Sequence, residues 1–169
     1  MTLIRFAGPG DVVAIEDVRS RSWRAAYAGL LPQELIDEAT GPEAFERRLA
    51  SFAGAPEART LLAEAADGTP LGMAAFGPER DLPPHPDAVE LYSLYVAPEH
   101  WSAKVGWALV ERVMAESRKA GRDRVTLWVL ESNARARGFY ERAGFTAGEQ
   151  RRHELWGHAF DEVRYEIAL

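Results

Sequence analysis

The stretch VELYSLYVAPEHWSAKVGWAL, residues 89–109, decides the fold. Its first half alternates apolar and polar residues, which is typical of a β-strand, and Pro98 ends the alternation. Apolar residues return at helical spacing from Val105, so a helix follows the loop. Backbone N–H groups in the first turn of a helix lack partners within the helix and can hold an anion. The stretch therefore predicts a strand, a loop and a helix N-terminus arranged as a phosphate-binding unit.

A second stretch, VLESNARARGFYERAGF at residues 129–145, repeats the order of strand, turn and helix. Its distinctive positions are an asparagine after the strand, an aromatic pair in the helix and a Gly-Phe exit: Asn133, Phe139, Tyr140, Gly144 and Phe145. Together the two stretches resemble the acyl-CoA-binding signatures of the GNAT superfamily of N-acetyltransferases. They stand in the order of that family, separated by one helix and one strand, and the resemblance covers most of the chain.

The loop of the first stretch departs from the family pattern at two places. That pattern is Gln or Arg, two residues, Gly, one residue, then Gly or Ala, and Gly106 fits its last place. Trp101 stands in the first place and Lys104 in the first glycine place. A glycine there lets the backbone approach a pyrophosphate closely and adopt conformations that a side chain disfavours. The lysine sets that steric cost against an ammonium group that can reach the phosphates.

Length and composition bound the class of protein. The 169 residues suit a single domain spanning 1–169, and 47% hydrophobic and 27% charged residues are ordinary globular values. The net charge of −6 argues against nucleic acid as a partner, because binding its phosphates requires a basic face. No apolar run reaches the roughly 18 residues of a membrane helix. We therefore expect a soluble, cytoplasmic protein without a membrane partner.

Residues and motifs that the sequence lacks exclude several chemistries. The chain has no cysteine, which excludes disulfides, thiolate nucleophiles and thiolate metal sites and fits a reducing cytosol. The four histidines show no metal-ligand spacing, so we expect no metal. Neither a G-x-S-x-G motif nor a Walker A loop is present, which argues against a hydrolase or an NTPase.

The order of elements predicts an α+β (mixed α/β) fold. Besides the strand of the first stretch, strands are expected at 2–6, 60–65, 71–76, 124–130, 145–149 and 162–169, with helices between them. The turn residues Asp67 and Gly68 predict a hairpin, whereas the strand–helix–strand passage over 89–130 requires a parallel or crossover neighbour. The resemblance implies the GNAT fold, a central mixed, mostly antiparallel sheet flanked by helices. Two central parallel strands of that fold splay apart to admit pantetheine.

The resemblance also implies acetyl-CoA as the co-substrate. Backbone groups of Leu94, Tyr95 and Val96 would pair with pantetheine as if it were another strand. The amides of 102–107 would face the pyrophosphate. The loop that we assign to the cofactor comprises Trp101, Ser102, Ala103, Lys104, Val105, Gly106 and Trp107. Asn133 matches a family position that touches the cofactor, and it also suits a helix N-cap; the two roles are compatible.

Acetyl transfer requires a base for the ammonium proton and an acid for the leaving thiolate. Tyr140 is the expected acid, because a phenol of pKa about 10 can donate to a thiolate whose acid has a pKa near 8.5. Glu90 lies eleven residues before Trp101, where one branch of the family carries its glutamate base; an exposed strand-edge residue is the alternative. Tyr92, on the same face of the strand, would orient water or substrate.

Two aromatic residues of the first helix, Trp23 and Tyr27, lie beside its core-facing stripe. Such residues either extend the core or face a cleft. The segment SWRAAYAGLLP that contains them resembles the first helix and loop that wall the acceptor site in many members of the family. We therefore expect Trp23, Tyr27 and Tyr92 to line the acceptor pocket.

These observations predict an acetyl-CoA-dependent N-acetyltransferase that works by direct attack of a primary amine on the thioester. The acceptor stays open between a small molecule, a peptide N-terminus and a lysine side chain, and a homodimer is compatible with the sequence. The alternative is a GNAT-shaped binding module that has lost catalysis because Trp101 and Lys104 spoil the pyrophosphate loop. Retention of Asn133 and Tyr140 favours the enzyme.

Overall fold

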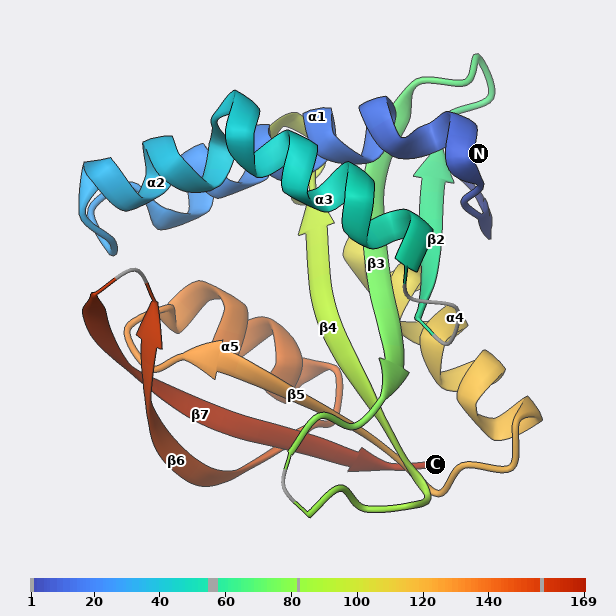
Figure 1. The fold of residues 1–169 in the computed structure, drawn as a ribbon. Coiled ribbons are helices and arrows are strands. Elements are labelled where there is room, and N and C mark those ends of the chain that lie inside the picture. Colours follow the sequence, from blue (N-terminus) through green and yellow to red (C-terminus); the bar gives the residue numbers. More distant parts are fainter. Residues whose placement is uncertain (1, 55–57, 82, 156) are drawn as a thin grey trace.

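The alternating residues before Pro98 form a strand at the centre of a seven-stranded sheet (Figure 1). The computed structural model describes residues 2–54, 58–81, 83–155 and 157–169, and the strands in these residues have the order β1-β2-β3-β4-β5-β7-β6. The strands are β1 (Leu3–Phe6), β2 (Arg59–Glu64), β3 (Pro70–Pro78), β4 (Ala88–Val96), β5 (Arg124–Leu130), β6 (Thr146–Leu155) and β7 (His158–Ala168). The helices are α1 (Val12–Tyr27), α2 (Gln33–Thr40), α3 (Pro42–Gly54), α4 (Val105–Lys119) and α5 (Ala134–Arg142), with short 3₁₀ turns at Pro9–Asp11 and Pro98–His100.

The sheet is antiparallel except between β4 and β5. These two strands run parallel, and they are paired at three positions, residues 88–90 against residues 124–126. Beyond Glu90 the strands diverge, and β7 pairs with the whole of β5 from its other side (Figure 1). The predicted mixed, mostly antiparallel sheet is therefore confirmed, and it opens between its two parallel strands.

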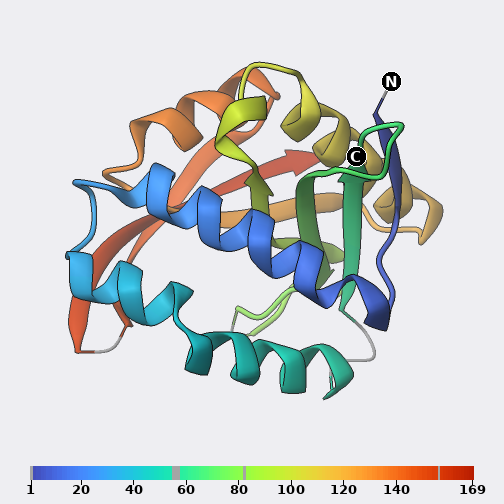
Figure 2. The same ribbon diagram turned by 90° about the horizontal axis from the view of Figure 1, so that it is seen from above.

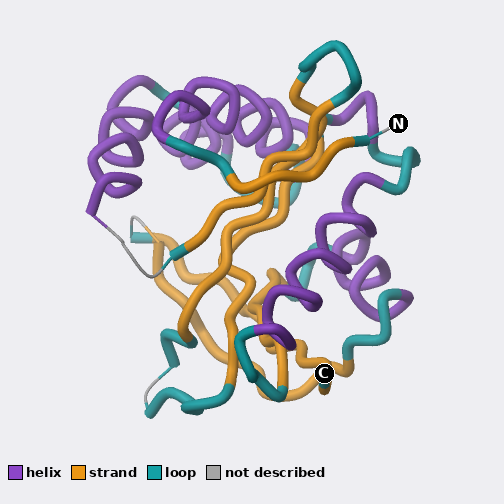
Figure 3. The backbone as a smooth tube through the Cα atoms, turned by 90° about the vertical axis from the view of Figure 1, so that its right-hand side faces the viewer, coloured by secondary structure: helices purple, strands orange, loops and turns teal. Residues whose placement is uncertain are grey.

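Helices cover both faces of the sheet (Figures 2 and 3). On one face α1 buries Ile15 and Val18 against Leu62 and Met73. On the opposite face α4 buries its apolar stripe, with Leu109 inaccessible to solvent, in the larger core. Because α1 and α4 both pack on β3 and β4, the C-terminal part of α1 and the N-terminus of α4 are fixed beside the open end of β4.

The terminal hairpin is longer than the sequence predicted. We expected strands at 145–149 and 162–169 with a polar segment between them, whereas β6 and β7 continue into that segment. Cross-strand ion pairs explain the difference, because Arg151 pairs with Glu162 at 2.8 Å and Arg152 with Asp161 at 3.4 Å. Polar residues at these positions are therefore strand residues.

A half-buried carboxylate, that of Glu16, fastens α1 to α3. Glu16 accepts hydrogen bonds from Arg19 and Ser20 of its own helix and from Arg48 of α3, at 2.5–3.1 Å. Burial by itself would raise the pKa of Glu16, but these hydrogen bonds outweigh it and hold that pKa at about 2.

Replacing Glu16 with glutamine should destabilise the fold at neutral pH by about 2 kcal/mol. A carboxyl whose pKa is lowered on folding stabilises the protein above its unfolded-state pKa and loses that contribution as pH falls toward its folded-state pKa. The difference in unfolding free energy between wild type and Glu16→Gln should therefore shrink as pH falls from about 4.5 to about 2. Urea denaturation at a series of pH values measures it, and a pH-independent difference would contradict the assigned role.

Within the described residues, no helix combines the length and the apolar character that crossing a membrane requires.

Candidate active site

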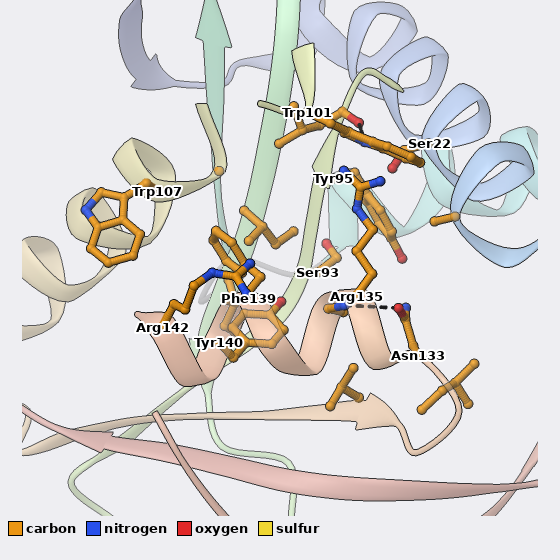
Figure 4. A pocket seen from close by; sticks show the side chains of 18 of the residues that line it. Ser22, Ser93, Tyr95, Trp101, Trp107, Asn133, Arg135, Phe139, Tyr140 and Arg142 are labelled. Atoms are coloured by element: carbon orange, nitrogen blue, oxygen red, sulfur yellow. Dashed lines mark hydrogen bonds between the residues drawn. The ribbon is translucent and has the colours of Figure 1, made fainter. Parts of the chain in front are cut away.

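A cavity of about 900 Å³ occupies the space where β4 and β5 diverge (Figure 4). Residues of β4, β5, β7, α1, α4 and α5 line it, together with the loop that leads into α4. Its volume lies within the range of sites that enclose small organic ligands and cofactors. The cavity therefore joins the two stretches that the sequence singled out, because one supplies β4 and the α4 loop and the other supplies β5 and α5.

The start of α4 forms one end of this cavity. Five backbone amides donate no hydrogen bond to any described residue: those of Ser102, Lys104, Val105, Gly106 and Trp107. The amide of Ala103 is occupied, because it donates to the carbonyl of His100 at 3.0 Å. The loop thus leaves five of the six predicted amides free, in the position where a helix N-terminus favours an anion.

Lys104 has the backbone conformation that the family pattern assigns to glycine. Its φ of 61° and ψ of 10° are left-handed, and among the described residues it is the one non-glycine residue with positive φ. A side chain in this conformation costs roughly 1–2 kcal/mol. The loop therefore has a conformation that glycine would adopt readily, and it bears strain at Lys104.

Replacing Lys104 with glycine should act in opposite directions on stability and on acetyl-CoA binding. Relief of the left-handed strain should raise the unfolding free energy by up to about 1 kcal/mol. Loss of an ammonium group near the phosphates should weaken acetyl-CoA binding and reduce its dependence on salt. Thermal melts and calorimetric titrations at two ionic strengths measure both effects; tighter binding would show that the lysine obstructs the loop.

Three cations line the cavity without an acidic partner among the described residues: Lys104, Arg135 and Arg142. Arg135 stacks its guanidinium over the Trp101 ring at 3.5 Å from the ring centre (Figure 4), and partial burial lowers the pKa of Arg135. Trp101 is held in turn by a 2.8 Å hydrogen bond from its Nε1 to the carbonyl of Val96. In a chain of net charge −6, these cations form a local positive site.

The open edge of β4 provides the second part of the site. Leu94, Tyr95 and Val96 pair with β3, and no strand pairs with their side facing β5. An extended ligand can therefore add along this edge as a strand would. Alternate residues of a strand direct their backbone groups to opposite sides, and the amide of Ala97 bonds to Leu71 of β3, so Leu94 and Val96 are the residues that face the opening. The carbonyl of Val96 is already engaged by Trp101, which leaves the amide of Val96 and both backbone groups of Leu94 open.

Asn133 and Tyr140 both line the cavity from the second stretch. Asn133 is buried and caps α5, since its Oδ1 accepts a hydrogen bond from the amide of Ala136 at 3.1 Å. Tyr140 is 8% exposed, and its hydroxyl makes no hydrogen bond to a described residue. Burial, with a smaller contribution from Tyr95, raises the pKa of Tyr140 well above its usual value. The hydroxyl is therefore protonated at neutral pH and free to donate into the cavity.

The predicted acceptor residues are only partly in the cavity. Tyr27 and Tyr92 line it, and the Tyr92 hydroxyl donates to the carbonyl of Pro78 at 2.6 Å. Trp23 does not line it; its Nε1 donates to the Tyr95 hydroxyl at 2.8 Å, and its ring lies 4.6 Å from that of Tyr27. Trp23 therefore contacts two residues that line the cavity, Tyr27 and Tyr95, without lining it itself.

Glu90 lies outside the cavity lining, contrary to its predicted role as the base. It is 3% exposed, and it sits where β4 and β5 are still paired. Its carboxylate accepts hydrogen bonds from Arg80, including one of 2.5 Å from the guanidinium and one of 2.9 Å from the amide. Because Arg80 occupies both oxygens, the structure makes Glu90 an ion-pair residue.

The sequence interpretation gave no role to four charged residues of the cavity: Glu111, Arg135, Arg142 and Glu162. The two arginines lie in the second stretch, so their position in α5 was available as a signal. Glu162 gave no signal in the sequence, because it reaches the cavity only through the pairing of β7 with β5, where it is opposite Leu130.

One group of potential metal ligands lies elsewhere among the described residues. Ligand atoms of His85, Asp87 and Asp123 are within 4.8 Å of one another. Local partners already engage them, since His85 Nδ1 accepts from the Asp87 amide and Asp123 pairs with Arg124 at 2.9 Å. We assign no function to this group.

Comparison with known proteins shows which family the chain belongs to. The family model described as the acetyltransferase (GNAT) family matches residues 14–145. A probable N-acetyltransferase of Mycobacterium tuberculosis is 29% identical to this chain, over 84% of the length of this chain and 78% of the length of that protein. An L-amino acid N-acyltransferase of Escherichia coli is 27% identical to this chain, over 87% of the length of this chain and 81% of the length of that protein. The structure of a putative acetyltransferase of Salmonella typhimurium with its cofactor acetyl-CoA has a TM-score of 0.74 and 24% identity, over 99% of this chain and 94% of that one.

The chain therefore belongs to the GNAT family of acetyltransferases. The predicted family and fold are both confirmed.

Proposed function

We propose that the protein transfers the acetyl group of acetyl-CoA to a primary amine by direct attack on the thioester. The observation that carries this proposal is the anion site at the start of α4, where five free amides meet three unpaired cations. The pyrophosphate binds there, and pantetheine extends along the open edge of β4 past Leu94 and Val96. This placement directs the thioester toward Tyr140.

The chain's own groups supply the steps that follow attack. The amine nitrogen bonds to the carbonyl carbon, and a free backbone amide of β4 stabilises the oxyanion. The bond from carbon to sulfur then breaks, the Tyr140 hydroxyl donates its proton to the thiolate, and the proton lost from the nitrogen restores the hydroxyl. Burial favours this step, since it keeps the Tyr140 hydroxyl in its protonated form.

The acceptor enters from the α1 side of the cavity, where Ser22, Ala26 and Tyr27 form the wall. The name of the E. coli relative makes free L-amino acids the first acceptors to test. Small alkylamines and the N-termini of short peptides are the next, because each presents a primary amine on a narrow chain. Lysine side chains complete the set.

An acetyl-transfer assay tests the proposal. The protein is incubated with acetyl-CoA and a panel of L-amino acids, amino acid amides, n-alkylamines and short peptides, and free thiol is measured together with the mass of the acetylated amine. We expect thiol release that depends on one class of amine. Binding of acetyl-CoA without any acetylated amine would instead support the non-catalytic module, and absence of binding would overturn both functions.

A further inference from the structure

Two carboxylates of the described residues line the cavity, and they lie in different parts of it. Glu111 belongs to α4 and shares the cofactor side with Trp107. Glu162 belongs to β7, opposite Leu130 at the end of β5. Glu162 is thus the carboxylate that a molecule entering past α1 meets.

Glu162, Tyr140 and Tyr27 line the same cavity from β7, α5 and α1. Burial, with smaller contributions from charges that include Glu162, raises the pKa of Tyr27 well above its usual value. The cavity therefore presents a carboxylate and the expected acid on different elements of the fold.

The carboxylate of Glu162 is held by one oxygen and free at the other. Its Oε2 accepts a 2.8 Å hydrogen bond from Arg151 Nε, while Oε1 has no partner among the described residues. Arg151 is itself fixed, since it lies over the Trp128 ring at 3.9 Å and pairs with Asp81 at 3.3 Å. The Glu162 side chain is 15% exposed, so a free oxygen here is shielded from bulk water and has few alternative donors.

We propose that Glu162 is the catalytic carboxylate of the acceptor site, whose Oε1 binds the acceptor's ammonium group and removes one proton from it. This inference rests on the proposed function. The neutral nitrogen then bonds to the acetyl carbon and the bond from carbon to sulfur breaks. Tyr140 gives its proton to the sulfur and is restored by the second proton lost from the nitrogen, and Glu162 releases its proton to solvent. One ammonium group and one thioester thus yield one amide, one thiol and one proton.

Replacing Glu162 with glutamine tests the proposal, because the amide keeps the shape and removes the charge. With n-butylamine and with L-amino acids as probes, kcat/KM for the amine should fall about 100-fold or more, while the KM for acetyl-CoA stays within about twofold. The matched control is Glu166→Gln, a more exposed glutamate of the same strand that pairs with Arg164 and does not line the cavity. This control should change neither the kcat/KM for the amine nor the KM for acetyl-CoA. An amine kcat/KM for Glu162→Gln within about threefold of wild type would overturn the proposal.

Two further variants separate catalysis from the ion pair. If Glu162 mattered only as a partner of Arg151, then Arg151→Met and Glu162→Gln would lower amine kcat/KM equally. We expect Arg151→Met, which keeps the carboxylate, to be at least about tenfold more active than Glu162→Gln, and equal losses would contradict the proposal. Glu162→Asp keeps the carboxylate on a side chain shorter by one methylene group. Its amine kcat/KM should lie between the values for wild type and Glu162→Gln. If Glu162→Gln fails to fold, this aspartate variant and Arg151→Met decide the question.

If wild type binds acetyl-CoA but acetylates no amine, calorimetric titration of the CoA complex with n-butylamine replaces the assay. Binding lost in Glu162→Gln supports the site, and no binding to wild type overturns it.

Discussion

Tyr140→Phe is expected to lower turnover by about 100-fold or more, while the affinity for acetyl-CoA stays within about twofold. The change removes only the hydroxyl. The ring keeps its edge contacts with Phe139 and Phe145 at 5.2 and 5.6 Å. Since the hydroxyl bonds to no described residue, its loss breaks no internal hydrogen bond. Single-turnover kinetics with saturating acetyl-CoA measure the step in which the hydroxyl acts.

Tyr165→Phe is the matched control for this experiment. Tyr165 is fully buried beside Tyr140, and its hydroxyl bonds to Glu141 at 2.7 Å and to Arg137 at 3.1 Å. Its loss should lower stability by roughly 1–2 kcal/mol and leave turnover nearly unchanged. The same turnover for Tyr140→Phe and wild type would contradict the general-acid role.

Neutralising the three unpaired cations together should weaken acetyl-CoA binding by roughly 10- to 100-fold at low ionic strength. The variant combines Lys104→Met, Arg135→Met and Arg142→Met. Each group is exposed, so each contributes a modest, salt-screened attraction to phosphate. The wild-type affinity should therefore fall with added salt more steeply than that of the variant. Calorimetric titration at two ionic strengths measures both quantities.

A control with the same change in net charge separates local from global electrostatics. It replaces Arg47, Arg118 and Lys119 with methionine, and none of these residues lines the cavity. We expect this control to bind acetyl-CoA about as tightly as wild type. Equal weakening in the two triple variants would show that net charge, rather than the site at the start of α4, governs binding.

The part of the cavity at the start of α4, where we propose that the cofactor binds, could be predicted because local sequence determines it. A strand, a loop and a helix start fix the positions of backbone amides within residues 89–109, whatever packs around them. The strain at Lys104 followed from the glycine that the family pattern has there, and the structure gives this residue a φ of 61°. Asn133 and Tyr140 likewise lie within one short helix and its cap, so their spacing placed them on the cavity.

The part of the cavity where we propose that the acceptor binds could not be predicted, since tertiary pairing determines it. The spacing of Glu90 suggested a base, but Arg80 arrives from the loop after β3 and neutralises it. A bulge at Tyr92, where β3 residues 75 and 76 pair with β4 residues 93 and 91, also interrupts the alternation that was assumed. Glu162 enters the cavity because β7 lies between β5 and β6, an order that no local pattern in the sequence indicates.

A crystal structure of the protein with acetyl-CoA tests the central claim most directly. The account predicts the pyrophosphate against the free amides of the α4 start, with pantetheine along β4 between Leu94 and Asn133. It also predicts the thioester sulfur within about 3.5 Å of the Tyr140 hydroxyl, a distance that permits proton donation. Acetyl-CoA bound elsewhere, or bound here with its sulfur directed away from Tyr140, would contradict the account.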